Sequence, residues 1–212
     1  AYEIPKRDWS SDVCSSDLLS ADQQLVALGG SGRIVKVYGT VDGKLRYKLT
    51  KHTDWITSLA FSSDGKKLAS ADRSGGIHLW DAASGGILLS LREHKAAVRA
   101  LAWRSDSRML ASGGEDGLLI WWDANDGWPA ITHQNAHPPV RPTGYYGKLP
   151  NGVLSLAFGP QGELLSAGRD HQVRLWRADG QAGKSYSTTS ALPDRKSTRL
   201  NSSHVSESRM PS

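Results

Sequence analysis

The 212-residue sequence is poor in the residue on which several kinds of protein chemistry depend. It contains a single cysteine, Cys14. One thiol forms no internal disulfide and no CxxC redox or CxxCH haem-attachment motif, so these chemistries are excluded within this stretch of sequence. The same scarcity gives no information on the redox compartment.

Long apolar runs are also missing. No stretch approaches the roughly 18 to 20 apolar residues of a membrane-spanning helix. No signal peptide is recognisable, although a truncated start would have removed one. We therefore expect no membrane span, and the localisation stays open.

The common catalytic motifs are absent as well. The sequence has no GxSxG, HExxH or GxxxxGK[ST] motif, and the glycine-rich stretch at residues 29–32 fits a tight turn between strands. His133 and His137 have the i, i+4 spacing of some metal ligands, but Pro138 and Pro139 argue against a helix there. We expect no enzyme activity, catalytic residue, cofactor, metal or small-molecule substrate.

What the sequence does contain is a repeat. Tyr38, Trp80 and Trp122 are spaced by 42 residues each, and Trp176 follows after 54. A period of about 40 to 45 residues is typical of one four-stranded blade of a β-propeller. The four similar segments are residues 25–39, 68–81, 110–123 and 164–177.

Within each unit, apolar residues alternate with period 2 and turn-forming residues follow. Alternation of this kind indicates half-buried strands, and the clusters between them indicate hairpins. In the second unit the pattern predicts strands over 56–61, 67–71, 76–80 and 87–91. The predicted fold class is all-β: a β-propeller fragment of about four four-stranded antiparallel blades, incomplete at both ends.

The repeat resembles the WD-repeat family, whose units usually close with Trp-Asp and open with Gly-His. Trp80-Asp81 and Trp122-Asp123 match the closing dipeptide, and His52, His94 and His137 stand at the opening position. The resemblance implies a hydrogen-bonded tie in each blade, built from a His, a strand Ser or Thr, a turn Asp and the Trp. Buried polar groups need such partners. The tie residues that it implies are His94, Ser112, Asp116 and Trp122, then His52, Ser70 and Trp80, then Ser166, Asp170 and Trp176.

Departures from the family pattern predict that the ties differ between blades. Ser74 replaces the turn Asp in the second unit and Gly32 replaces it in the first. Tyr38-Gly39 stands in place of Trp-Asp, and Trp176-Arg177 lacks the Asp.

Both ends of the sequence interrupt the repeat. Counting back one period places a first strand at about residues 14–19, and counting forward places another at 195, but both stretches are Ser-rich and read as missing strands. Residues 1–18 and 195–212 resemble translated sequencing-adaptor DNA, with disordered tails as the alternative. The expected propeller fragment is 19–194, with blades over about 19–51, 52–93, 94–136 and 137–190.

One segment lengthens the last unit, between His137 and Val153. Loops often carry function on a repeat scaffold. The resemblance places this loop, together with the other links between blades, on what we call the top face of the disc. Trp55 is notable there, because Ala97 occupies the matching position in the next unit. The candidate interaction face comprises Trp55, Arg73, Lys95, Glu115, Arg141, Tyr145, Tyr146 and Arg169.

Three functions are compatible with these features. The leading hypothesis is a non-catalytic scaffold that binds another protein, or another domain of its parent chain, through the top face. An alternative is an accessory domain of a larger bacterial redox or hydrolytic enzyme, because residues 35–62 and 192–194 look similar to bacterial WD-repeat proteins that carry a cytochrome-like domain. Nucleic-acid binding is disfavoured: the net charge of the sequence is +5, but the basic residues are spread over the units, and most of the Trp residues are committed to the repeat.

Overall fold

The computed structural model describes residues 14–138 and 152–187, and these residues form 16 β-strands. The first four are β1 (Cys14–Leu19), β2 (Leu25–Gly30), β3 (Val35–Gly39) and β4 (Leu45–Leu49). They are followed by β5 (Ile56–Phe61), β6 (Lys67–Asp72), β7 (Ile77–Asp81) and β8 (Ile87–Leu91). The third set is β9 (Val98–Trp103), β10 (Met109–Gly114), β11 (Leu119–Asp123) and β12 (Pro129–His133). The last set is β13 (Val153–Phe158), β14 (Leu164–Gly168), β15 (Gln172–Trp176) and β16 (Ala182–Ser187).

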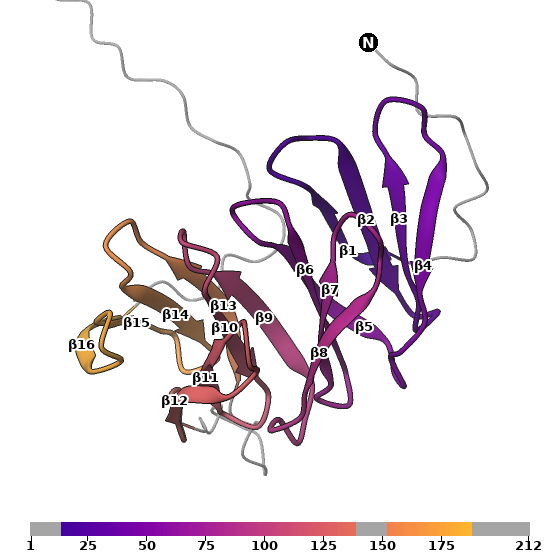
Figure 1. Cartoon of the computed structure of the whole chain (residues 1–212). Helices are drawn as coiled ribbons and strands as arrows, with labels where there is room; N and C mark the ends of the chain where they lie inside the picture. Colours follow the sequence, from indigo (N-terminus) through magenta and orange to yellow (C-terminus); the bar gives the residue numbers. More distant parts are fainter. Residues whose placement is uncertain (1–13, 139–151, 188–212) are drawn as a thin grey trace, which may run out of the picture.

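Each set of four strands forms one antiparallel sheet in chain order, and we number these sheets blades 1 to 4. The blades stand side by side and fan out from indigo to yellow without closing into a ring (Figure 1). This is the all-β, unclosed propeller architecture that the repeat predicts.

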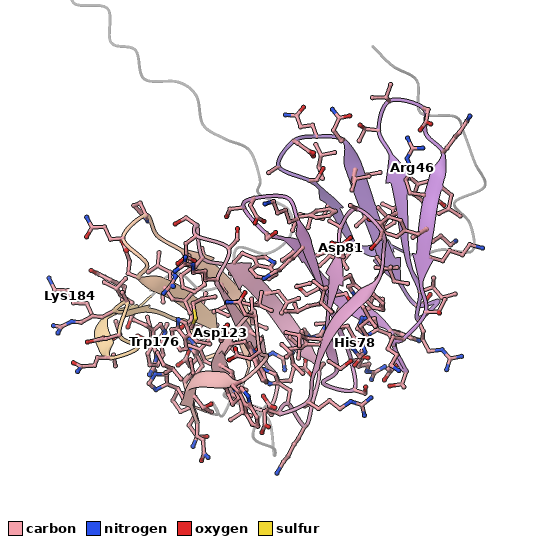
Figure 2. All side chains as sticks on the ribbon, in the orientation of Figure 1. Arg46, His78, Asp81, Asp123, Trp176 and Lys184 are labelled. Atoms are coloured by element: carbon pink, nitrogen blue, oxygen red, sulfur yellow. The ribbon has the colours of Figure 1, made fainter. Side chains whose placement is uncertain are left out.

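The first strand of each blade lies on the inner side of the fan. β1 contacts β5, β5 contacts β9, and β9 contacts β13, whereas the fourth strands have no comparable contact with the next blade. The outer strands carry charged side chains into solvent, such as Arg46 on β4 and Lys184 on β16 (Figure 2). Strand order within a blade therefore runs from the propeller axis to the periphery.

Burial is deepest in the two central blades. In β6 and β10 every residue after the first is buried, because a neighbouring blade covers each face of these strands. β16 is exposed along its whole length. Apolar side chains that gather between adjacent blades make three cores, one for each pair of neighbours. Burial between the blades, as well as hydrogen bonding within each blade, holds the assembly together.

The predicted strands of the second unit are confirmed to within one residue at each end. The expectation that the first strand is missing at residues 14–19 is wrong. β1 forms there and pairs antiparallel with β2, and Leu18 packs against the core between blades 1 and 2. Residue 195, where the next strand is expected to be missing, lies outside the described residues.

The blade links define the top face. An antiparallel four-stranded blade puts the link from its last strand and the loop between its second and third strands on the same side of the sheet. The links β4–β5 and β8–β9 and the loops β6–β7, β10–β11 and β14–β15 all lie on this face, which points downward in Figure 1.

Candidate functional site

Blade 3 carries a four-membered tie that connects the top face to the interior. His94 Nδ1 lies 3.0 Å from both carboxylate oxygens of Asp116, and its Nε2 lies 2.8 Å from Ser112 Oγ. The indole N–H of Trp122 donates to the same Ser112 oxygen at 2.8 Å. The carboxylate also accepts bonds from the backbone N–H groups of Lys95 and Leu118. The chain of bonds thus connects the link before the blade to its second and third strands.

Blade 4 repeats this arrangement, with His137 before the long insertion and the other members after it. His137 Nδ1 lies 2.7 Å from Asp170 Oδ1, His137 Nε2 lies 2.8 Å from Ser166 Oγ, and Trp176 donates to Ser166 at 2.8 Å. Asp170 also pairs with Arg174 at 3.0 Å. His133 and His137, which have i, i+4 spacing, bind different partners. His137 belongs to the tie, whereas His133 bonds the backbone oxygen of Gly180.

The tie of blade 2 is complete, although Ser74 stands at the turn position where the family pattern has Asp. The carboxylate comes from Asp72 at the end of β6, two residues before the expected position. Its Oδ2 lies 2.8 Å from His52 Nδ1, and its Oδ1 accepts bonds from the backbone N–H and the hydroxyl of Ser74. Ser70 Oγ lies 2.6 Å from His52 Nε2 and accepts the indole N–H of Trp80 at 2.7 Å.

Steric crowding explains why blade 2 carries the carboxylate at the strand end, whereas blades 3 and 4 carry it in the turn. At Gly114, which matches Asp72, an added Cβ would lie 2.5 Å from Asp116 Oδ1 and 2.6 Å from His94 Nδ1. A side chain at that position is therefore incompatible with a turn Asp. At Gly168, which matches it in blade 4, an added Cβ would collide with the ring of His137. Blade 2 has the opposite pair, with the carboxylate at the strand end and the short Ser74 in the turn.

Blade 1 is built differently. Leu28 and Tyr38 stand where blade 2 has Ser70 and Trp80, so neither the hydroxyl nor the indole of the tie is present. Val35, Val37 and Leu49 are fully or almost fully buried in its core instead.

The electrostatics of the ties are those of a structural network. Burial opposes ionisation of Asp72, but the bonds from His52, Ser74 and Gly76 outweigh it and lower the pKa from 3.8 to about 2. Burial also opposes ionisation of Asp116, and His94 again lowers its pKa. All the tie carboxylates form their hydrogen bonds within their own blade. Among residues 14–138 and 152–187, no group of three or more His, Cys, Asp or Glu side chains is arranged to hold a metal ion.

Trp55 is the main apolar feature of the top face. Its side chain lies in the link before β5 and is 52% exposed, and the guanidinium carbon of Arg73 lies 5.4 Å from the ring centroid. The backbone N–H of Arg73 donates to the Trp55 carbonyl, as that of Glu115 does to Ala97 in blade 3. The backbone arrangement is therefore the same with either side chain, and the exposed indole is an addition to it.

Charged residues continue this surface across blades 3 and 4. Glu115 pairs with Arg99 of its own blade at 2.8 Å and with Arg169 of blade 4 at 2.8 Å. Lys95 lies exposed beside them, in the link before β9. Arg141, Tyr145 and Tyr146, which the sequence placed on this face, lie outside the described residues.

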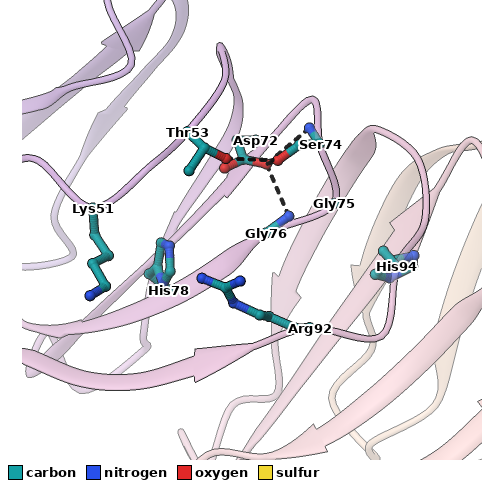
Figure 3. Close-up of a pocket in the computed structure, with 9 residues that line it drawn as sticks. All are labelled: Lys51, Thr53, Asp72, Ser74, Gly75, Gly76, His78, Arg92 and His94. Atoms are coloured by element: carbon teal, nitrogen blue, oxygen red, sulfur yellow. Dashed lines mark hydrogen bonds between the residues drawn. The ribbon is translucent and has the colours of Figure 1, made fainter.

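A pocket of about 230 Å³ opens beside blade 2 on the same face. Lys51 and Arg92 enter it from two different links, and His78 of β7 forms its inner wall (Figure 3). His78 is 2% exposed, bonds Ser90 Oγ through Nδ1 at 2.9 Å, and stacks edge-on against His52 at 4.6 Å between ring centroids. Burial lowers the pKa of His78 from 6.5 to about 4, with further lowering from His52, Arg92 and Lys51 and opposition from Asp72.

Comparison with protein families decides what this repeat is. The model of the WD domain, G-beta repeat, matches residues 43–81, 85–123 and 143–177, which is more than half of the chain. The chain belongs to the WD-repeat family. Each of the first two matched repeats begins before the last strand of one blade and ends with the third strand of the next. A single WD repeat thus links two neighbouring blades covalently.

Two curated proteins are similar to the chain over short segments. The chain is 37% identical over 62 residues to the Arabidopsis thaliana protein called periodic tryptophan protein 2, which is 29% of this chain and 7% of that protein. It is 33% identical over 78 residues to the Caenorhabditis elegans transcription factor unc-37, which is 37% of this chain and 12% of that protein. Both organisms are eukaryotes, so these relatives do not support the expected bacterial setting.

Solved structures share the fold over most of the chain. A structure of U3-55K superposes with a TM-score of 0.72 at 22% identity and covers 85% of this chain. A crystal structure of the mitotic checkpoint complex gives a TM-score of 0.72 at 26% identity and covers 87%. In both cases the chain spans 53% of the length of the matched structure.

The family pattern explains which tie residues can be predicted from the sequence and which cannot. Positions that match in spacing identify Ser70, Ser112 and Ser166. Asp72 is missed because the family motif places the carboxylate in the turn. The available signal is that only the second unit has a carboxylate at the strand end, where Gly114 and Gly168 stand in the following units.

Proposed function

We propose that this chain is a non-catalytic scaffold that binds another protein, or another domain of its own protein, through its top face. The observation that carries the proposal is the exposed indole of Trp55 with Arg73 over its ring. Blade 3 keeps the same backbone bond with Ala97 at this position, so blade structure does not require an exposed Trp. Trp and Arg are the residues that contribute most often to binding energy at protein interfaces.

The neighbouring charges support a recognition surface around that anchor. Arg73, Arg99 and Arg169 come from three successive blades, and Glu115 joins the last two. A protein partner that covers Trp55 meets a rim of fixed guanidinium groups, which suits the polar rim of a typical interface. One of the solved neighbours comes from a complex, which agrees with a binding role for the fold. The expected segment at Arg141, Tyr145 and Tyr146 remains part of the proposal.

The alternatives have less support. The enzyme-associated hypothesis rests on the resemblance of residues 35–62 and 192–194 alone, and it requires a haem or catalytic domain elsewhere in the gene. For nucleic acid, Trp80, Trp122 and Trp176 are buried, so they offer no stacking platform. Trp55 alone does not supply a row of stacked bases.

Site-specific photo-crosslinking tests the proposal. A photoreactive amino acid is placed at position 55 of the intact protein encoded at the locus, and separately at position 128. Trp128 is a matched control, because its side chain is 73% exposed but lies in the hairpin between β11 and β12, on the opposite face. We expect one defined polypeptide, or a defined domain of the same chain, to crosslink from position 55 and not from position 128. Arg73→Glu should abolish that product, and equal products from both positions would reject the top face as the binding surface.

A further inference from the structure

The pocket beside blade 2 contains an arrangement of charge that the blade itself does not use. We propose that it binds an oxyanion group at the end of a side chain of the polypeptide partner. This inference rests on the proposed function, and it specifies the chemistry of one contact with that partner. It is carried by Lys51 and Arg92, which point into one cavity from two different links (Figure 3).

The two cations are not paired with any carboxylate in the described part of the chain. Neither forms an ion pair with any residue in 14–138 or 152–187. Two like charges that converge on one cavity repel each other, and an anion between them removes this repulsion. By contrast, Arg99 and Arg169 on the same face share Glu115.

Asp72 lines the pocket and is ionised, but it forms no ion pair with Lys51 or Arg92, so two cations face one carboxylate. Its Oδ2 is bonded to His52, and its Oδ1 accepts three bonds, from the N–H and hydroxyl of Ser74 and from the N–H of Gly76. The side chain is 1% exposed, so its oxygens are not presented to a ligand. The carboxylate therefore belongs to the tie.

The other walls complete a polar cavity of suitable size. His78 contributes a neutral imidazole at physiological pH, and Thr53 lies at the rim with its hydroxyl 3.2 Å from that of Ser74. Gly75 approaches the link before β9 so closely that an added Cβ would collide with the carbonyl of His94. About 230 Å³ is the space of several water molecules at about 30 Å³ each, which accommodates a carboxylate or a phosphate with some of its hydration.

A polypeptide side chain fits this site better than a nucleic acid. Within the pocket, Lys51 and Arg92 form a single pair rather than a row that follows a phosphate backbone, and no exposed aromatic side chain lines the pocket. A carboxylate of an acidic residue and a phosphate of a phosphorylated residue offer the same oxyanion chemistry. Both form charge-assisted hydrogen bonds with Lys and Arg.

Titration with small anions separates this inference from the proposed function, because no partner is needed. The probes are N-acetyl-O-phosphoserine amide and N-acetylglutamate amide, added to the 15N-labelled chain. We expect saturable shifts of the Thr53, Ser74 and Gly75 amides, with a dissociation constant of roughly a millimolar. Lys51→Gln with Arg92→Gln should weaken binding at least tenfold. Bound anion should also raise the pKa of His78, which a ring-proton titration reports.

The control variant carries Lys66→Gln with Arg108→Gln, an equal loss of charge at exposed turn residues on the opposite face. It should bind like the parent chain. Saturation by the phosphate probe alone assigns a phosphorylated partner, and saturation by both assigns an acidic one. The inference is overturned if neither probe saturates, or if the Lys51 and Arg92 variant binds as tightly as the control. Binding of a single-stranded oligonucleotide with the same variant sensitivity, while both monomer probes fail, would assign the pocket to nucleic acid instead.

Discussion

At the scale of single residues, the ties show that one buried network can be assembled from two different pairs of positions. Blade 3 uses Asp116 in the turn and Gly114 at the strand end, whereas blade 2 uses Asp72 at the strand end and Ser74 in the turn. Each arrangement gives the histidine Nδ1 a carboxylate partner. The two positions must therefore change together, which is a condition that substitutions can test.

Single substitutions should rank the members of the tie. Asp72→Ala leaves the buried ring of His52 without its carboxylate, and we expect it to destabilise blade 2 by about 3 kcal/mol. Asp116→Ala should have a similar effect on blade 3. Ser74→Ala removes one hydroxyl bond to Asp72 and should cost only about 1 kcal/mol. Native-state hydrogen exchange of the strand amides measures each blade separately. Equal costs for Ser74→Ala and Asp72→Ala would contradict this assignment of the carboxylate.

Exchange of the pair gives a stricter test. Asp72→Gly removes the carboxylate, and Ser74→Asp alone places a second carboxylate beside Asp72. The double variant Asp72→Gly with Ser74→Asp recreates the arrangement of blade 3. We expect it to recover most of the stability lost in Asp72→Gly, with a coupling energy of about 1 to 3 kcal/mol in a double-mutant cycle. Additive effects of the two substitutions would show that the blades do not share one geometry.

Acidification should weaken blade 2 in two stages. The pKa of His78 falls from 6.5 to about 4 on folding, so between these pH values the unfolded chain binds a proton that the folded chain does not. The free energy of unfolding therefore falls as pH falls through this window, by up to about 3 kcal/mol in total. Asp72, with its pKa lowered to about 2, contributes stability that is lost below pH 3.8.

The variant His78→Ile, which copies Ile120 of blade 3, isolates the first stage. Urea denaturation of this variant should show a smaller dependence on pH between 6.5 and 4 than the parent chain, and the same dependence below 3.8. An unchanged slope in the upper window would mean that His78 titrates normally in the folded protein.

Sequence spacing predicts most tie residues, because strand positions recur at a fixed interval. It does not predict Asp72, because a carboxylate can reach the same histidine from two backbone positions, and only the three-dimensional approach decides which one. The sequence does not predict the exposure of a side chain either. Trp55 and Trp80 are the same residue type, yet Trp55 is 52% exposed and Trp80 is 4% exposed.

At the scale of elements, the turn between the first and second strands repeats one backbone conformation in all four blades. Gln23, Gly65, Ser107 and Gly162 occupy the matching position, and all have positive φ, between 58° and 84°. Glycine adopts this conformation without strain, whereas other residues pay a steric cost. Two blades therefore carry a strained residue at this turn.

Gln23→Gly should relieve the strain in blade 1. The side chain of Gln23 is exposed, and its backbone bonds to Ser20 and Thr40 do not depend on the side chain. We expect a gain of about 0.5 to 1 kcal/mol in the free energy of unfolding. Ser107→Gly is the contrasting variant, because the Ser107 hydroxyl accepts the backbone N–H of Asp64 across the blade interface at 3.0 Å. A larger gain from Ser107→Gly than from Gln23→Gly would contradict this reasoning.

The strands themselves were the most predictable elements. Alternating apolar residues in β5, β9 and β13 identify one buried face, and period and turn residues set the register. The sequence does not predict β1, because CSSDLL lacks that alternation. A strand can form nonetheless, since pairing with β2 uses main-chain groups that every one of these residues possesses.

At the scale of the whole molecule, the ties are buried beneath the top face, and the residues of the proposed binding surface lie outside them. Buried His, Asp, Ser and Trp side chains fix the links between blades, and Trp55, Arg73 and the Glu115 ion pairs lie outside them. A rigid link holds an exposed side chain in one place, which reduces the entropy lost on binding. Repeat spacing could predict the face but not the pocket, because Lys51 and Arg92 meet only when two links fold beside blade 2.

The most direct test compares binding of the crosslinked partner by two variants of the intact protein, Trp55→Ala and Trp128→Ala. Each removes one exposed indole, from opposite faces, and isothermal titration calorimetry measures the dissociation constant. The top-face account predicts that Trp55→Ala weakens binding by at least about thirtyfold, which corresponds to the roughly 2 kcal/mol of an interface hot spot, and that Trp128→Ala leaves it unchanged. Unchanged binding by Trp55→Ala, or a greater loss in Trp128→Ala, would contradict the account.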